Sequence, residues 1–303
     1  MAKTVRETIK EITYKHLKEN KSLCFGQCLT AVGWVGGTLP ELYEEDGMVE
    51  VPTSDVANGG FVVGAGLKGV RPIYVVRYQG FQWYNAPMIV NYASKSKELW
   101  QIPCPIFVRS IAMEGAIGPV AGSSHHSLFQ RMPGTKILAP MTPGEYQYAF
   151  DQFMKEDDVY YISEHRRSYD NKEETQDVIH ENADITMFPI SVTRFDAEIA
   201  RQKLEAEGIK ANIIHQLWIK PFDFKPEWKQ ALNNSKHGGL VLDDDYEEGV
   251  ASSIAQVMMI ESNHKKVHTL GLDHRTAGFH PDVDNLPPSP DKIVAKVKQI
   301  LGK

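Results

Sequence analysis

The stretch VPTSDVANGGFVVGAGLKGVRPIYVVRYQGFQWYNAPMIVNYASK, residues 51–95, decides the fold of this chain. It runs from an acidic turn at 52–55 through small and aliphatic residues at 57–69 to a β-branched segment at 73–76. A glycine inside a helix costs about 1 kcal/mol against alanine, so the glycines of 57–69 predict close approach by a neighbouring backbone or a ligand. Residues 73–76 predict a buried strand. Aromatic residues crowd its carboxyl end, where open α/β sheets bind ligands: Tyr78, Phe81, Trp83 and Tyr84.

Several motifs of this stretch match a known family. PTSD at 52–55 is followed without gaps by GVRP at 69–72, by Phe81 and by NYASK at 91–95. Further matching pieces are PCPIFVR at 103–109, HH at 125–126, PGTKILAP at 133–140 and EHR at 164–166. On these motifs the chain resembles the pyrimidine-binding domain of thiamine-diphosphate (thiamine pyrophosphate) enzymes. It is most similar to the beta subunit of the decarboxylating component of 2-oxoacid dehydrogenase complexes, as in pyruvate dehydrogenase.

The resemblance and the order of expected elements predict an α/β fold of two three-layer α/β/α domains. The first domain, residues 1–175, would be the pyrimidine-binding domain with a parallel sheet. Residues 170–183 are polar and lack apolar periodicity, which indicates a linker. The second, smaller domain, residues 184–303, would be like the transketolase C-terminal domain, because strands and helices alternate along it.

The resemblance places Asp55 where the family has a catalytic glutamate. That glutamate binds the aminopyrimidine ring of the cofactor and promotes the tautomer that generates the reactive ylid. Aspartate is shorter by one methylene, on the order of 1.5 Å, and a misplacement of about 1 Å can cost roughly a hundredfold in rate. Asp55 therefore acts on an adjusted backbone, or binds the cofactor with poor activation, or only caps the next helix. The first alternative is our expectation.

Three further residues are expected at the cofactor. By the resemblance, Phe81 stacks on the aminopyrimidine and Tyr78 lines the same strand end. Gln27 follows Gly26, where the beta-subunit family usually carries an acid that faces the cofactor cleft. A neutral amide there changes the local charge, or it is a loop residue without a catalytic part.

The loop after Arg109, residues 110–126, is rich in small residues and delivers His125 and His126. Such a loop at the end of a strand is typical of a functional site. By the resemblance, His126 is the histidine that serves substrate or proton transfer, with His125 as the second choice. The alternatives are an exposed, idle pair of histidines and one half of a metal site. We expect no metal, because no Cys, His or Asp set nearby in the sequence completes a ligand shell. The short segment 127–132 departs from the family and indicates a changed pocket or partner contact.

The sequence DDD at 243–245 ends a predicted strand. Carboxylates at a strand end either bind a cation or form a capped, solvated turn, and the turn is our expectation. Separately, Cys24, Cys28 and Cys104 have neither disulfide nor metal spacing. They indicate reduced thiols in a cytoplasmic protein.

No Gly-Asp-Gly motif occurs in the chain, although the resemblance implies such a motif for holding the cofactor diphosphate through Mg2+. We therefore expect an alpha subunit that carries the diphosphate- and Mg2+-binding half, an active site shared between chains, and an α2β2 heterotetramer. The implied reaction is oxidative decarboxylation of a small 2-oxoacid, an oxidoreductase step with transfer to a lipoyl acyltransferase. The alternatives are a split transketolase or carboligase (a transferase) acting on a ketose-type substrate, and a catalytically silent structural subunit.

Charge and hydropathy exclude other partners. The formal net charge is −6 and no long basic block occurs, so nucleic acid is not an expected partner. No apolar run reaches the length of a membrane helix. The first helix is mixed with glutamates, unlike a mitochondrial transit peptide. We expect a cytoplasmic enzyme without membrane contact.

Overall fold

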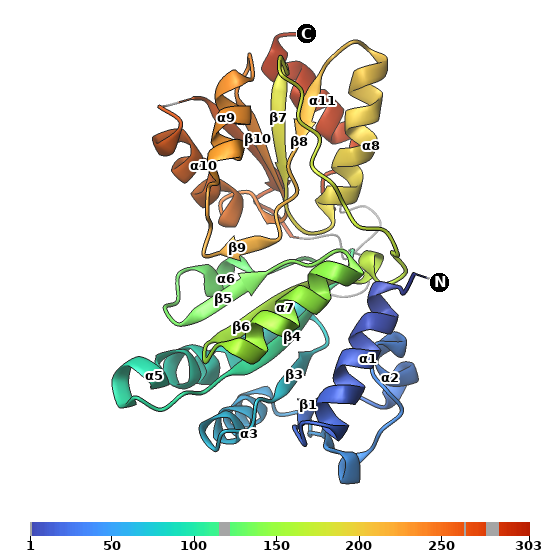
Figure 1. Ribbon diagram of the computed structural model, residues 1–303, viewed down its shortest axis with the longest axis vertical. Helices are drawn as coiled ribbons and strands as arrows, with labels where there is room; N and C mark the ends of the chain where they lie inside the picture. The colour runs from blue at the N-terminus through green and yellow to red at the C-terminus, as the bar shows by residue number, and fades with distance from the viewer. Residues whose placement is uncertain (1, 115–121, 264, 277–284) are drawn as a thin grey trace. The chain divides into compact units, whose positions relative to one another are not determined.

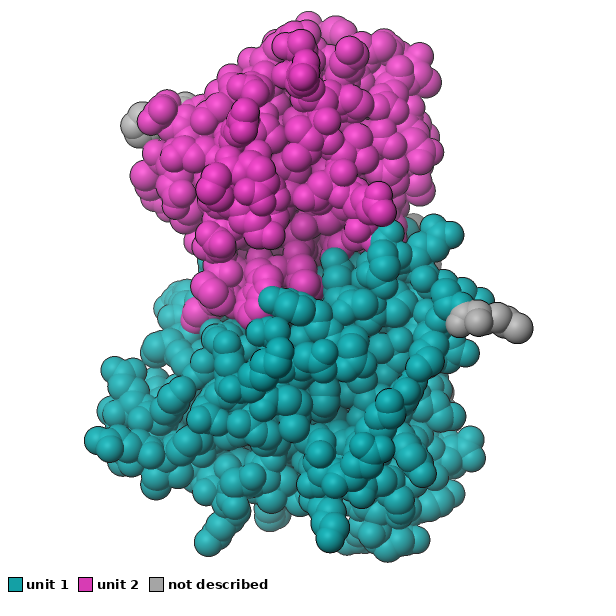
Figure 2. All heavy atoms as spheres, viewed as in Figure 1, with its two compact units in different colours: residues 1–113, 128–174 teal, residues 114–127, 175–303 magenta. Residues whose placement is uncertain are grey.

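The computed structural model describes residues 2–114, 122–263, 265–276 and 285–303. They form two compact units, of residues 1–113 with 128–174 and of residues 114–127 with 175–303 (Figure 2). The segment that carries both histidines thus groups with the second unit, whereas the sequence analysis placed it inside a continuous first domain. Residues 115–121 of the expected functional loop lie outside the described residues. Across the described ranges, every helix is either too short or too polar to cross a lipid bilayer.

The chain up to residue 174 alternates strands and helices (Figure 1). In order these are α1 (Val5–Lys18), β1 (Cys24–Gly26), α2 (Ala31–Gly37), η1 (Glu44–Asp46), β2 (Met48–Glu50), α3 (Asp55–Leu67), β3 (Ile73–Val76), η2 (Gln79–Phe81), α4 (Gln82–Met88), η3 (Ile89–Ala93), α5 (Ser94–Trp100), β4 (Ile106–Ala112), α6 (Ser127–Gln130), β5 (Thr135–Leu138), α7 (Pro143–Lys155), β6 (Val159–His165) and η4 (Arg166–Ser168).

The sheet of the first unit has the strand order β2-β1-β3-β4-β6-β5. The register joins Ile73 to Phe107 and Ile106 to Val159, and these strand pairs are all parallel. Every residue of β4 and β6 is buried, which is the pattern of strands covered on both faces. The predicted parallel α/β architecture of this part is confirmed.

Helix α1 forms where the apolar periodicity predicts it. A capping box of Thr4 and Glu7 starts the helix, and its apolar stripe, including Ile9 and Ile12, is buried. Helix α1 packs against α7, which begins with Pro143 after the side-chain cap Thr142. These caps satisfy amide groups that a helix cannot satisfy internally.

The glycines of α3 permit the close packing that the sequence predicts. A Cβ at Gly59 would lie 3.1 Å from the carbonyl oxygen of Asn85 in α4, and one at Gly66 would lie 2.8 Å from Cys104 Sγ. Larger residues would push α3 away from these neighbours. The loss of helix propensity is therefore offset by close helix packing.

The glycine-rich sequence GWVGG at 33–37 is typical of a loop, but the structure has helix α2 at Ala31–Gly37. The backbone φ is positive at every residue from Gly33 to Gly37, so this part of α2 is a left-handed turn, which glycine adopts readily. Val35 is buried, and the backbone N–H of Thr38 donates to carbonyl oxygens of the last turn.

The second unit contains β7 (Ile185–Pro189), α8 (Thr193–Ala206), β8 (Ala211–Ile213), β9 (Trp218–Lys220), α9 (Pro226–Asn234), β10 (Gly239–Tyr246), α10 (Val250–Glu261), β11 (Val267–Leu272) and α11 (Pro290–Leu301). Its four-stranded sheet has the order β11-β10-β7-β8 with parallel neighbours. Helices α8 and α11 cover one face, and α9 and α10 cover the other (Figure 1). This confirms the predicted layered α/β fold of the second part.

Candidate functional site

A cavity of about 190 Å3 opens in the first unit at the carboxyl ends of β1 and β3. Its lining residues are Gln27, Cys28, Asp55, Tyr74, Val75, Val76, Arg77, Tyr78, Phe81 and Asn85. Gln27 directly follows β1, Tyr78 closely follows β3, and Asp55 is the first residue of α3. The carboxyl ends of parallel strands are the usual place for a ligand in an open α/β sheet. The structure thus brings four expected cofactor residues, Gln27, Asp55, Tyr78 and Phe81, to one cavity.

Asp55 is held by the neighbouring amide. Gln27 Nε2 donates to Asp55 Oδ1 at 2.9 Å, and Asp55 Oδ2 has no hydrogen bond to a described residue. The position at the start of α3 also favours a negative charge, because backbone N–H groups of the first helical turn point toward it. Burial and the Asp55 carboxylate raise the pKa of Tyr74, which keeps this neighbour neutral. The arrangement presents one carboxylate oxygen as an oriented acceptor.

Aromatic rings form another side of the cavity. The centroids of Tyr78 and Phe81 lie 5.8 Å apart with tilted planes. Arg166 lies over the Tyr78 ring at 5.6 Å from its centroid and fixes that ring from outside the cavity lining. Phe81 remains partly exposed and offers an apolar face.

These residues fit the aminopyrimidine half of thiamine diphosphate. A carboxyl group such as that of Asp55 can hydrogen-bond a ring nitrogen through a shared proton, and Phe81 offers a surface on which a planar ring can stack. The apolar walls of Val75 and Val76 complete a partly dry environment.

Arg77 is a cavity residue that the sequence analysis did not select. Its Nε is buried and lacks a hydrogen-bond partner among the described residues. The reasoning used for Tyr78, a position just past a buried strand, applies equally to Arg77. It gives the cavity wall a positive charge beside the carboxylate.

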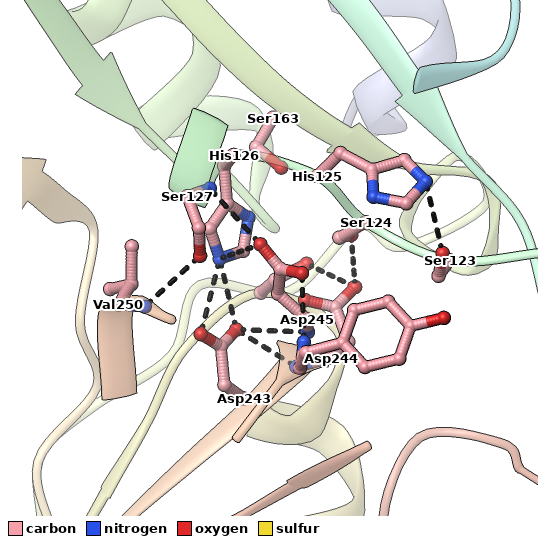
Figure 3. A network of polar contacts seen from close by, with 12 residues as sticks. Ser123, Ser124, His125, His126, Ser127, Ser163, Asp243, Asp244, Asp245 and Val250 are labelled. Carbon is pink, nitrogen blue, oxygen red and sulfur yellow. Dashed lines mark hydrogen bonds and ion pairs between the residues drawn. The ribbon is translucent and has the colours of Figure 1, made fainter. Parts of the chain in front are cut away.

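His125 and His126 belong to the second unit. There His126 faces the carboxylates at the end of β10, whereas His125 lies apart from them beside Ser123 (Figure 3). Asp243, Asp244 and Asp245 were expected to form a capped, solvated turn. This expectation is wrong, because their exposed fractions are 0%, 1% and 3%. The fold buries them against residues 123–127 and Ser191.

The ring of His126 points at this cluster (Figure 3). Its Nε2 lies 3.1 Å from one Asp243 oxygen, 3.2 Å from the other, and 3.9 Å from Asp245 Oδ2. Burial by itself lowers the pKa of His126, but the carboxylates outweigh it and raise this pKa to about 10. His126 is therefore protonated at neutral pH when no other cation is present.

Asp244 is oriented by hydroxyl groups. Ser124 Oγ donates to Asp244 Oδ2 at 2.7 Å and Ser191 Oγ donates to the same atom at 3.0 Å. Burial, with Asp243 adding to it, raises the pKa of Asp244 to about 7 despite the opposing charge of His126. A charge on Asp244 is thus poorly compensated.

The neighbouring loop is also fixed to the strand end. The backbone N–H of Ser127 donates to Asp245 Oδ2 at 3.0 Å, and Ser127 Oγ accepts from the N–H of Val250 at 3.0 Å. A side chain at Gly249 would collide with Ser127. These contacts start α10 and hold the loop against β10.

His125 differs from His126 in exposure. Its ring is only partly buried, stacks with Tyr246 at a centroid distance of 6.5 Å, and contacts Ser123 Oγ through Nε2 at 3.1 Å. Burial lowers the pKa of His125 although Asp245 opposes this. The two adjacent histidines are therefore shifted in opposite directions.

Two known protein families match this chain. The family described as transketolase, pyrimidine binding domain matches residues 2–172, and transketolase, C-terminal domain matches residues 175–290. The 2-oxoisovalerate dehydrogenase subunit beta of Bacillus subtilis (strain 168) is 26% identical over 313 residues, covering 93% of this chain and 93% of that protein. The acetoin:2,6-dichlorophenolindophenol oxidoreductase subunit beta of Cupriavidus necator is 25% identical, and the match covers 89% of this chain and 86% of that protein.

A solved structure described as split gene transketolase, inactive beta4 tetramer, has a similar fold. It superposes with a TM-score of 0.76 at 15% identity and covers 100% of this chain and 99% of that chain.

Proposed function

Because this chain belongs to the transketolase family, with a pyrimidine-binding domain followed by a transketolase C-terminal domain, we propose that it is the beta subunit of a thiamine-diphosphate-dependent enzyme of the 2-oxoacid dehydrogenase type. The cavity that combines Asp55 with Phe81 carries the proposal. Relatives named as beta subunits of 2-oxoacid dehydrogenases support it over most of the chain.

The residues of this chain bind and orient the pyrimidine half of the cofactor. Asp55 Oδ2 would hydrogen-bond a ring nitrogen through a shared proton, while Gln27 Nε2 donates to Oδ1, the other oxygen. Phe81 packs against the ring, and Tyr78 supports Phe81. When bound, the cofactor would supply a nucleophilic carbon for reaction with a substrate carbonyl.

An alpha subunit completes the active site. The chain lacks a Gly-Asp-Gly motif, so the partner holds the diphosphate and Mg2+. Exposed large apolar side chains gather on consecutive helices from α3 to α5 in the first unit: Val56, Phe61, Trp83, Tyr84, Tyr92, Leu99 and Trp100. Apolar surface of this kind marks interaction sites. We assign it to the alpha subunit in an α2β2 assembly.

The proposed reaction is oxidative decarboxylation of a small 2-oxoacid, followed by transfer to the lipoyl group of an acyltransferase. The amide of Gln27 beside a shortened acid, Asp55, supports a second candidate, a split transketolase or carboligase acting on a ketose-type substrate. The fold shared with a split transketolase is compatible with this candidate.

Of the two histidines, His125 is the better candidate for contact with substrate. Its ring keeps exposed surface, whereas His126 is fully buried and faces Asp243. The catalytic assignment of His126 stays a prediction.

The test begins with co-purification of this chain with its candidate alpha chain. Thiamine diphosphate with Mg2+ should bind tightly to the complex and not to the isolated chain, as read by circular dichroism and calorimetry. Asp55→Ala should lower turnover about 10²–10⁴-fold, whereas the matched control Asp151→Ala, an acid on α7 outside the cavity, should not. Turnover is then measured on 2-oxoacids and on ketoses.

Each outcome decides a different part of the proposal. Turnover that is indifferent to Asp55→Ala would remove Asp55 from the mechanism. A complex that binds cofactor but converts neither substrate class is a silent structural subunit. Tight cofactor binding by the isolated chain would contradict the shared site.

A further inference from the structure

We propose that His126, Asp243 and Asp244 bind a divalent transition-metal ion in the second unit. Each offers one donor atom, an imidazole nitrogen or a carboxylate oxygen, and these atoms all lie within 4.8 Å of one another. All three residues are buried. Figure 3 shows the His126 ring facing the carboxylates that end β10. The proposed ion is separate from the Mg2+ that we assign to the partner subunit.

The donor set selects the class of metal. Imidazole nitrogen with carboxylate oxygens suits Zn2+ and similar transition metals, whereas Mg2+ and Ca2+ favour shells made of oxygen alone. Around a tetrahedral ion with bonds of about 2.0–2.2 Å, neighbouring donors lie roughly 3.4 Å apart. His126 Nε2 and Asp243 are already within this distance at 3.1 Å. Because all three donors lie within 4.8 Å, the separations to Asp244 need to shorten by no more than roughly 1.4 Å, which side-chain rotation supplies.

A second observation points to a missing ligand. Asp244 Oδ1 is buried and has no hydrogen-bond partner among the described residues, although Oδ2 accepts from both Ser124 and Ser191. Buried carboxylate oxygens are normally paired, so an isolated one calls for an explanation. Hydroxyl groups that hold one oxygen and leave the other free are also a common way of orienting a metal ligand.

The carboxylate of Asp243 is also oriented by a hydrogen bond. Its Oδ1 accepts from the backbone N–H of Asp244 at 2.8 Å, and its carboxylate faces His126 Nε2. A metal ion would lie between these two side chains. The ligands would keep their positions at the strand end.

The composition of the cluster also favours a cation. Asp243, Asp244 and Asp245 are all buried beside one imidazole, and buried carboxylates are normally paired or bound to a metal ion. The bound ion would tie the loop at 122–127 to the end of β10.

The test uses the full-length chain, first freed of metal with a chelator and then titrated with Zn2+, Mn2+ and Mg2+ by calorimetry. We expect about one Zn2+ per chain, as for a structural zinc site, with Mn2+ weaker and Mg2+ not bound. Co2+ in place of Zn2+ should give the visible absorption of a low-symmetry site with nitrogen and oxygen donors.

Matched variants locate the ion. Asp244→Asn should weaken Zn2+ binding more than about 100-fold, and Ser191→Ala, which loosens the Asp244 carboxylate, should weaken it about 10-fold. Asp291→Asn changes an exposed carboxylate at the start of α11, in the same unit but outside the cluster, and should leave binding unchanged. Circular dichroism verifies that each variant is folded. Ser191→Ala and the Co2+ spectrum keep the test decisive if Asp244→Asn does not fold.

The competing explanation is a buried ion-pair latch that needs no metal. No Zn2+ binding by the folded wild-type chain would establish that latch and overturn the proposal. Binding that Asp244→Asn and Ser191→Ala both leave intact would place the ion elsewhere and overturn it equally.

Discussion

Each unit of this protein buries charge, but the two do so in opposite ways. In the first unit, Arg109 donates to both oxygens of Glu164, at 2.7 and 3.0 Å. The hydroxyls of Tyr146 and Tyr169 also donate to Glu164, at 2.7 and 2.9 Å. One cation meets one anion, and the anion is surrounded by donors. In the second unit, a single imidazole faces the carboxylates of residues 243–245.

The difference separates a pair built for stability from a cluster with unused binding capacity. A bidentate ion pair with its remaining lone pairs satisfied has little to offer a ligand. A cluster with excess negative charge and an unpartnered oxygen gains from a further cation. Arg109 Nη1 is a buried donor without a partner among the described residues, but a cationic donor does not attract a metal ion. Of the two arrangements, the second is the one with an unpartnered acceptor, Asp244 Oδ1.

The largest effect is expected from breaking the balanced pair. Glu164→Gln leaves the Arg109 charge buried without its anion, so the free energy of unfolding should fall by about 3–5 kcal/mol. Urea unfolding followed by circular dichroism measures this loss. The double variant Arg109→Met with Glu164→Leu should recover much of it, because it removes both charges. A loss below about 1 kcal/mol for Glu164→Gln would fit a surface pair and contradict this account.

A smaller effect concerns two histidines with opposite environments. His165 follows Glu164 and is fully buried, and burial, with Arg167 adding to it, lowers its pKa to about 3. His126 is shifted upward by its carboxylates. An unfolded histidine titrates near pH 6.5, so between about pH 6.5 and pH 3 the unfolded state binds more protons at this residue than the folded state does. The contribution of His165 to the free energy of unfolding therefore falls as the pH falls.

Between pH 7.5 and pH 5, His165 alone should cost about 2 kcal/mol of unfolding free energy. Urea unfolding at the two pH values measures it. His165→Asn should lose less stability over this interval than the wild type, while the exposed control His237→Asn should match the wild type. Equal losses in all three proteins would mean that His165 does not resist protonation.

The smallest effect should come from the unbalanced cluster. In chelator-treated protein at pH 8, Asp244→Asn should change the unfolding free energy by less than about 1 kcal/mol, or raise it, because it removes a charge whose burial is poorly compensated. Added Zn2+ should then stabilise the wild type but not the variant. A loss as large as that of Glu164→Gln would show that the cluster is balanced after all.

The first unit was largely predictable because its signals are local. The strand at Ile73–Val76 has the predicted bounds, and the ungapped frame from Asp55 to Phe81 placed both residues at one cavity. Periodicity, turn residues and strand ends are read within a few residues of each other. Helix α2 was not predicted, because its backbone has positive φ at residues 33–37 and no sequence periodicity indicates such a turn.

The cluster in the second unit could not be predicted in this way. Asp243 is separated from His126 by 117 residues along the chain, and no local pattern reports which loop a strand end will meet. The Asp run resembled a polar turn for the same reason, because burial depends on what packs over it. Such contacts follow from tertiary packing alone.

The grouping of residues 114–127 with the later part of the chain affects how this protein can be divided. The polypeptide passes between the units after Met113, after Ser127 and after Glu174. A single cut after Glu174 would leave the histidine segment on the N-terminal fragment, separated from the aspartates that hold it. Exchanging either half with a relative therefore requires moving two separate pieces of sequence together, and evolution by simple fusion or fission at one junction faces the same constraint.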